Sequence, residues 1–88
     1  MRAVITVIGK DKVGIIARVS TLLSDNGINI LDISQTIMQD EVFTMIMLVD
    51  MQEKAVSDIS EGIRNIERDM GLSIHIQNED IFNLMHRI

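Results

Sequence analysis

The sequence predicts a single α+β domain, with four strands and two long helices in the order β-α-β-β-α-β and a short helix at the C-terminus. Two segments have apolar residues at helical spacing, and runs rich in β-branched residues lie before, between and after them. Eighty-eight residues correspond to one domain. We therefore expect residues 1–88 to form one unit, with 79–87 as an appended helix.

The first strand and helix are predicted at residues 3–8 and 13–26. The β-branched run stops at Gly9, a short polar loop follows, and Gly27 stands where a glycine commonly ends a helix. Apolar residues recur in the helix at intervals of three and four, namely Ile15, Ile16, Val19, Leu22 and Leu23. The loop exposes backbone N–H groups at the positive end of the helix dipole, which favours a bound carboxylate or phosphate. We expect any binding site to begin there.

Two further strands are predicted at residues 28–38 and 42–49, joined by a turn at 39–41. The first of them is long enough to bend or carry a bulge, because its apolar residues change faces between Ile30 and Leu31. The second has large apolar side chains on both faces. It is therefore expected in the centre of the sheet or beneath a subunit interface.

The second long helix is predicted after Asp50 and Glu53, which have the three-residue offset of a capping box. Gly71 ends an apolar stripe formed by Val56, Ile59, Ile63, Ile66 and Met70. Residues 72–77 alternate as a strand, with Leu72, Ile74 and Ile76 pointing inward. Asn78 is then expected to cap the short last helix.

Right-handed crossovers place both long helices on one face of a four-stranded antiparallel sheet with the spatial order 4-1-3-2. This arrangement is the ferredoxin-like fold. Because that fold carries many functions, particular residues must decide between them.

Composition excludes several classes of function. A net charge of −5 and two aromatic residues are opposed to direct nucleic-acid binding. The absence of cysteine excludes disulfides, thiolate metal sites and a cysteine nucleophile. His75 and His86 form no metal-binding pattern, and no catalytic set of residues is recognisable. No signal peptide or membrane span is apparent, so we expect a cytoplasmic protein that is not an enzyme, needs no cofactor and does not bind membranes.

Two motifs carry a resemblance to a known family. They are Gly9-Lys-Asp-Lys-Val-Gly14-Ile-Ile-Ala-Arg-Val and, at a suitable distance, Gly27-Ile-Asn29-Ile. Together, inside this topology, they resemble the ACT domain, a small-molecule regulatory module of amino-acid metabolism. The C-terminal residues 79–88 are similar to those of bacterial proteins that consist of one ACT domain and are related to the transcriptional repressor of the glycine cleavage system.

The resemblance implies an effector site between the first loop and the start of the strand at 28–38, often with both subunits of a dimer contributing. The residues that it implies are Asp11, Lys12, Val13, Gly14, Ile15, Asn29 and Ile30. In this interpretation Asp11 holds an ammonium group, backbone N–H groups of 13–15 hold a carboxylate, and Asn29 bonds to either. The alternative is purely structural: Asp11 caps the helix, Gly14 permits close packing, and Asn29 satisfies backbone groups.

These observations predict a non-catalytic regulatory module that binds an amino acid or similar small molecule and acts on an unknown partner protein. The alternative is a dimeric protein-interaction module with no small-molecule ligand. A homodimer is expected through strand edges or through packed sheet faces, and the second geometry would place Met45 and Met47 in the interface. The apolar stripe of the last helix, Ile81, Leu84, Met85 and Ile88, is expected to dock on the sheet or on the partner subunit.

Overall fold

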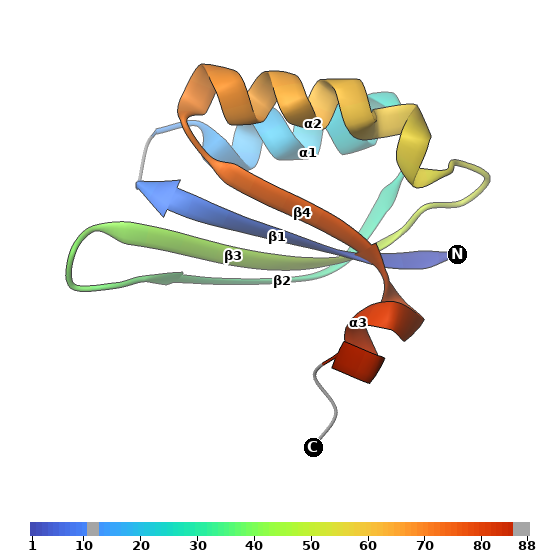
Figure 1. The fold of residues 1–88 in the computed structure, drawn as a ribbon. Helices are drawn as coiled ribbons and strands as arrows, with labels where there is room; N and C mark the ends of the chain where they lie inside the picture. The colour runs from blue at the N-terminus through green and yellow to red at the C-terminus, as the bar shows by residue number, and fades with distance from the viewer. Residues whose placement is uncertain (11–12, 86–88) are drawn as a thin grey trace.

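The computed structural model describes residues 1–10 and 13–85 and has the predicted ferredoxin-like architecture (Figure 1). Two long helices cover one face of a four-stranded antiparallel sheet, and a short third helix lies beneath the opposite face. In chain order the elements are β1 (Arg2–Lys10), α1 (Ile15–Asp25), β2 (Asn29–Ile37), β3 (Val42–Asp50), α2 (Val56–Met70), β4 (Ser73–Asn78) and α3 (Glu79–Met85).

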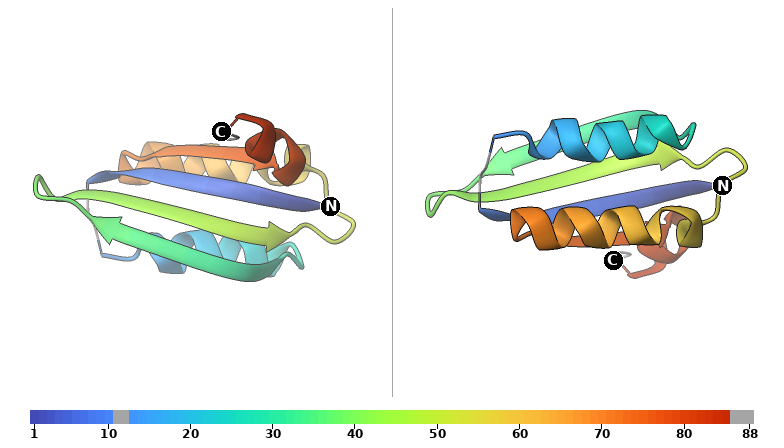
Figure 2. Two further views of the ribbon diagram at one scale, coloured as in Figure 1. Left: turned by 90° about the horizontal axis from the view of Figure 1, so that it is seen from below. Right: turned by 90° about the horizontal axis from the view of Figure 1, so that it is seen from above.

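The strand order is β2-β3-β1-β4, which is the predicted order read from the other edge (Figure 2). The bulge predicted near Ile30 is confirmed: Ile30 lies opposite Val49, whereas Asp32 lies opposite Leu48, so that Leu31 is the extra residue. The long strand β3 is central, as its two apolar faces predicted.

The core lies between the sheet and the two long helices. Its fully buried side chains include Ile5 and Val7 of β1, Val19 and Leu23 of α1, and Ile59 of α2. Met45 and Met47 also belong to this core and are fully buried. The prediction that they lie in an interface between sheet faces is therefore wrong, because they alternate with Ile46 and point toward the helices.

The first strand and helix differ from their predicted limits for local backbone reasons. The strand continues through Gly9, which pairs with Phe43, and a Cβ at Gly9 would lie 2.5 Å from Leu72 Cδ2. The helix begins at Ile15 and not at residue 13, since Gly14 has a left-handed conformation with φ 93°. A side chain at Gly9 would thus force Leu72 to shift, and Gly14 is favoured by the turn into α1.

The predicted capping box of Asp50 and Glu53 is wrong. The α2 helix begins after Ala55, whose backbone N–H donates to Asp58 Oδ2 at 2.8 Å. Asp50 instead accepts a hydrogen bond from the backbone N–H of Gln52 at 3.0 Å. Asp58 has the role expected of Glu53 because the connection after β3 turns once more before the helix starts.

The short helix α3 packs against β1 and β4 on the face opposite α1 and α2. Asn78 Oδ1 accepts the backbone N–H of Asp80 at 2.8 Å, which confirms the predicted cap. Residues 86–88, at the end of the predicted helix, lie outside the described residues. Within the described part of the chain, no helix is long and apolar enough to cross a membrane.

Candidate functional site

The start of α1 is the part of the predicted site that the structure describes. Gly14 precedes the helix, and its carbonyl oxygen accepts the backbone N–H of Arg18 at 2.9 Å. Among the described residues, no side chain caps this end, and no acidic residue lies in the first turn. The first N–H groups of α1 therefore have no intrahelical acceptor, and no carboxylate of the first turn opposes an anion there.

A hollow on the inner side of this helix start separates α1 from β2 and β3. Its volume is about 540 Å³, and it is lined by Gly14, Ile15, Ile16, Ala17, Gln35, Ile37 and Phe43. Apart from the Gln35 amide, the side chains in this lining are apolar. The inner hollow therefore combines backbone donors at one end with an aliphatic and aromatic wall, a combination common in small-molecule sites.

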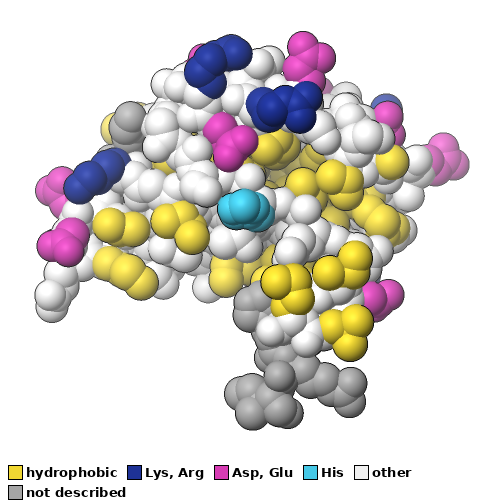
Figure 3. Space-filling view, viewed as in Figure 1, with side chains coloured by type: hydrophobic (Ala, Val, Ile, Leu, Met, Phe, Trp, Pro, Cys, Tyr) yellow, Lys and Arg dark blue, Asp and Glu magenta, His cyan; other side chains and the backbone are white. Residues whose placement is uncertain are grey.

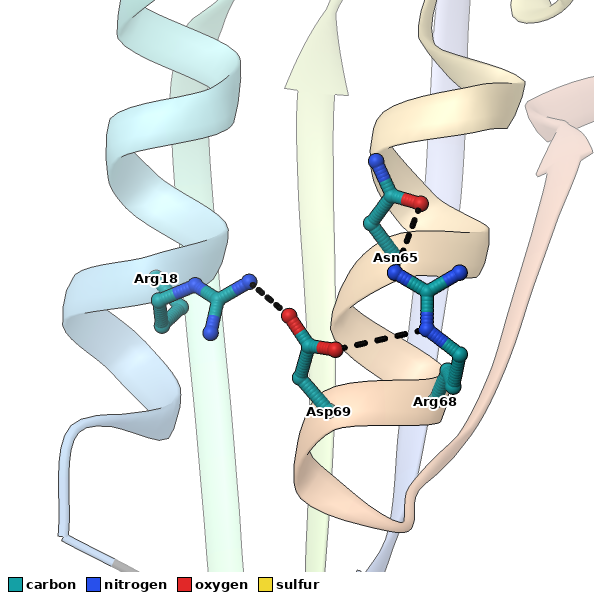
Figure 4. Close-up of polar contacts among 4 residues, drawn as sticks. All are labelled: Arg18, Asn65, Arg68 and Asp69. Atoms are coloured by element: carbon teal, nitrogen blue, oxygen red, sulfur yellow. Dashed lines mark hydrogen bonds and ion pairs between the residues drawn. The ribbon is translucent and has the colours of Figure 1, made fainter.

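A second hollow of about 480 Å³ lies on the outer side of the same helix start, between α1 and the end of α2. Val13 and Arg18 are among its lining residues. The Arg18 guanidinium donates to Asp69 Oδ2 at 3.3 Å, and Asp69 also binds Arg68 (Figure 4). The Arg18 guanidinium is thus already paired with a carboxylate of α2.

Asn29 and Ile30 line a third hollow, of about 490 Å³, beside the other end of α1. Ser20 and Ser24 of α1 and the turn at Gly27 form the rest of this hollow, together with Ile28. Its polar groups are hydroxyl and amide groups, which can either donate or accept hydrogen bonds.

The residues predicted to bind one ligand are thus distributed along the length of α1. Gly14 and Ile15 lie at the inner hollow, Val13 at the outer one, and Asn29 and Ile30 at the third. The α1 helix has 11 residues, so its two ends are about 16 Å apart. Asp11 and Lys12 lie outside the described residues, and their predicted roles stay predictions.

Three lining residues were missed by sequence reasoning: Gln35, Ile37 and Phe43. The turn between β2 and β3 places Ile37 opposite Phe43, and the β1–β3 pairing places Phe43 opposite Gly9 at the same end of the sheet. The predicted hairpin turn at 39–41 was the signal that could have located this wall. Among the described residues, no three His, Cys, Asp or Glu side chains are placed to hold a metal ion.

Comparison with known proteins agrees with this architecture. The family model of the ACT domain matches residues 2–77. The chain belongs to the ACT domain family. It is 56% identical over 90 aligned positions to a UPF0237 protein of Clostridium perfringens, with 100% of both chains covered.

Solved structures extend this agreement to three dimensions. An ACT domain protein from Streptococcus pneumoniae is 40% identical, with a TM-score of 0.78 and 93% of each chain covered. A candidate glycine cleavage system transcriptional repressor has a TM-score of 0.76 at 24% identity, over 86% of this chain and 44% of that one. The second likeness concerns the fold alone. ACT domains are commonly regulatory modules that bind small molecules.

Proposed function

We propose that this ACT domain is a non-catalytic regulatory module of the cytoplasm that binds an amino acid or similar small molecule between two copies of the chain. The ligand-bound dimer then acts on a partner protein. The observation that carries the proposal is the separation of Gly14 from Asn29 by the length of α1. One small ligand contacts both only if a second copy supplies one of them.

The β2 edge offers the means to bring two copies together. Every residue of β2 except Ile30 is exposed, and its sequence contains no proline and only one charged residue, Asp32. Long edges of this kind invite pairing with another chain. Ile33 and Ile37 on this strand and Ile16 on α1 are 42%, 59% and 38% exposed, so edge pairing would also bury apolar surface.

Antiparallel pairing of two β2 strands about a two-fold axis near Ile33 sets Asn29 opposite the partner's Ile37. Neighbouring strands are about 4.8 Å apart, so the third hollow of one copy would lie beside the inner hollow of the other. The total exposed surface is consistent with association. It measures 5657 Å², whereas folded monomers of 9.9 kDa expose about 5,200 Å².

The chemistry of the combined site suits an amino acid. The first N–H groups of α1 can receive the carboxylate, the apolar wall of the inner hollow can receive the side chain, and Asp11 is the proposed partner of the ammonium group. The Asn29 amide, contributed by the other copy, can donate to the carboxylate or accept from the ammonium. Lys12, Val13 and Ile30 would complete the surroundings of the ligand.

Titration of the free amino acids tests the proposal. The chain has no Trp or Tyr, so calorimetry and amide NMR shifts at Val13, Gly14 and Ile15 are the suitable readouts. Asp11→Ala and Asn29→Ala should each weaken binding by roughly 1 to 3 kcal/mol, about 5- to 150-fold, without unfolding the protein. Asn65→Ala is the matched control, since Asn65 lies on α2 and its side-chain oxygen accepts a hydrogen bond from Arg68.

The second candidate function is a dimeric interaction module with no small-molecule ligand. The exposed apolar residues Ile81, Leu84 and Met85 of α3 favour it, because they offer a docking surface away from the three hollows. The absence of any amide shift with all amino acids would select this alternative. If Asp11→Ala and Asn29→Ala lower the stability but leave the ligand affinity unchanged, these two residues have a structural role only.

A further inference from the structure

The helix side of β2 has an amide in the middle of an apolar row. Gln35 lies opposite Met45, which is fully buried beneath the two long helices. Residues directly opposite one another share a face of the sheet, so the Gln35 side chain also points to the helix side. Its neighbours on this face of β2 are Ile33 and Ile37. Gln35 therefore interrupts a face that is otherwise apolar at this edge of the sheet.

The Gln35 amide is available to a ligand. The last residues of β2 run past the start of α1 (Figure 2), and Gln35 is exposed although it lies on the helix side. Within the described part of the chain, its side chain makes no hydrogen bond with another residue. The amide, with two protons to donate and an oxygen to accept, therefore lines the inner hollow without a protein partner. Polar residues that break an apolar pattern in this way are expected at functional sites.

The rest of the inner hollow determines which ligand side chains suit it. Ile16, Ile37 and Phe43 give it an apolar wall, and none of its described lining residues is charged. An acidic or basic ligand side chain would therefore lose water there without gaining an opposite charge. The volume of about 540 Å³ is in the usual range of small-molecule sites, so a side chain has room beside the main-chain groups of the ligand. These features favour an amino acid with a neutral side chain over glycine.

We propose that Gln35 determines the specificity of the inner hollow and selects an amino acid with a side-chain carboxamide, asparagine or glutamine. This inference rests on the function proposed above, in which the start of α1 receives the ligand carboxylate. Two carboxamides form a pair of hydrogen bonds in which each group donates one and accepts one, whereas a hydroxyl group has a single proton to donate. The methylene groups of the ligand contact the apolar wall. Edge pairing through β2 withdraws the amide pair from water, where its hydrogen bonds are stronger.

Two sets of amino acids of matched shape test the proposal by calorimetric titration. Asparagine, aspartate and leucine have side chains of one branched shape that differ in polarity and charge, and glutamine, glutamate and methionine form the corresponding longer set. The carboxamide of at least one set should bind about 5- to 150-fold more tightly than the apolar member, the range expected for two hydrogen bonds. The acidic member and glycine should also bind less tightly. In NMR spectra the side-chain amide signals of Gln35 should shift most with the carboxamide ligand.

The variant Gln35→Met removes the amide and keeps the length of the side chain. It should abolish the preference for the carboxamide ligand and leave the affinity for leucine or methionine unchanged or higher. Gln77→Met is the matched control, because Gln77 lies on β4, at the other edge of the sheet, and donates to Met85 Sδ of α3 at 3.4 Å. The exposed apolar side chains of α3 lie below the sheet, on the face opposite the inner hollow (Figure 3). Thr36→Val, on the other face of β2, controls for changes in edge pairing.

The possible results separate this inference from the function on which it rests. Equal affinities for the carboxamide and apolar members of both sets would overturn the role of Gln35 and leave amino-acid binding in place. The same conclusion would follow from tightest binding of glycine or of a charged amino acid, or from a preference that Gln35→Met retains. Binding of no amino acid at all would overturn the proposed function and this inference with it. Loss of the preference in Gln35→Met, but in neither control, would support the assignment.

Discussion

Two binding-defective variants should restore binding when they are combined in one dimer. The variants are Asp11→Ala, which removes a proposed ligand group from the first loop, and Asn29→Ala, which removes one from the start of β2. In the proposed dimer each site takes its loop from one copy and its Asn29 from the other. A mixed dimer therefore contains one site with both defects and one site with none.

The geometry of the chain determines what fraction of the sites should regain the parental affinity. The nine residues of β2 span about 26 Å from Asn29 to Ile37, whereas a free amino acid is one residue long, about 4 Å. A ligand of that size cannot contact both Asn29 and Ile37 of the same copy. Random mixing of equal amounts makes half of the dimers mixed, and each mixed dimer has one intact site of two, so about a quarter of all sites should regain the parental affinity.

Calorimetry after co-refolding of the two variants measures this fraction as a stoichiometry. The expected result is about a quarter of the parental number of tight sites, with no tight sites in either variant alone. The reasoning is refuted if the mixture shows none, because every site would then take both residues from a single copy. Parental affinity in each variant alone would instead show that neither residue contacts the ligand.

Three further predictions concern stability and are measured by urea denaturation. Phe43→Ala should lower the free energy of unfolding by roughly 3 to 5 kcal/mol, since this side chain is 4% exposed and belongs both to the core and to the wall of the inner hollow. A loss below about 1 kcal/mol would mean that the core collapses around the gap. Gly14→Ala should lower the free energy of unfolding by roughly 1 to 2 kcal/mol because of its φ of 93°, since among the described residues no atom beyond the chain neighbours lies within 4 Å of the added Cβ; an unchanged midpoint would contradict the left-handed conformation. Arg18→Ala should cost less than about 1 kcal/mol, since both partners of the Arg18–Asp69 pair are nearly half exposed; a larger loss would show that this pair holds α1 to α2.

The order of elements could be predicted from the sequence because the signals are local. The bulge at Leu31 is an example: the apolar residues of β2 change faces at one step, and the structure inserts one residue at that step. Gly27 and Gly71 likewise end the two long helices with φ of 69° and 65°. Each of these features needs only a few neighbouring residues.

The errors arose where the outcome depends on tertiary packing. Both faces of β3 are apolar in sequence, so alternation alone could not decide that Met45 and Met47 face the two long helices and that Ile46 lies on the opposite face of the sheet. The start of α2 after Ala55 could not be predicted for a similar reason. Asp50 and Asp58 are both acceptable capping residues, and the path of the connection selects Asp58. The wall of the inner hollow, formed by Gln35, Ile37 and Phe43, arises from strand pairing, and in the sequence only the predicted turn at 39–41 pointed to it.

A ligand site shared between two copies makes ligand binding and association parts of one equilibrium. A ligand that binds only the paired form stabilises it by RT ln(1 + [L]/Kd) for each site, about 2.7 kcal/mol at one hundred times Kd. Two sites per dimer therefore strengthen association by about 5 kcal/mol, close to a 10⁴-fold change in the dissociation constant of the dimer. By the same linkage, any protein that binds the paired form raises the affinity for the ligand. A chain of 88 residues can in this way convert the concentration of a small molecule into the population of an assembled surface, without a conformational change inside either copy.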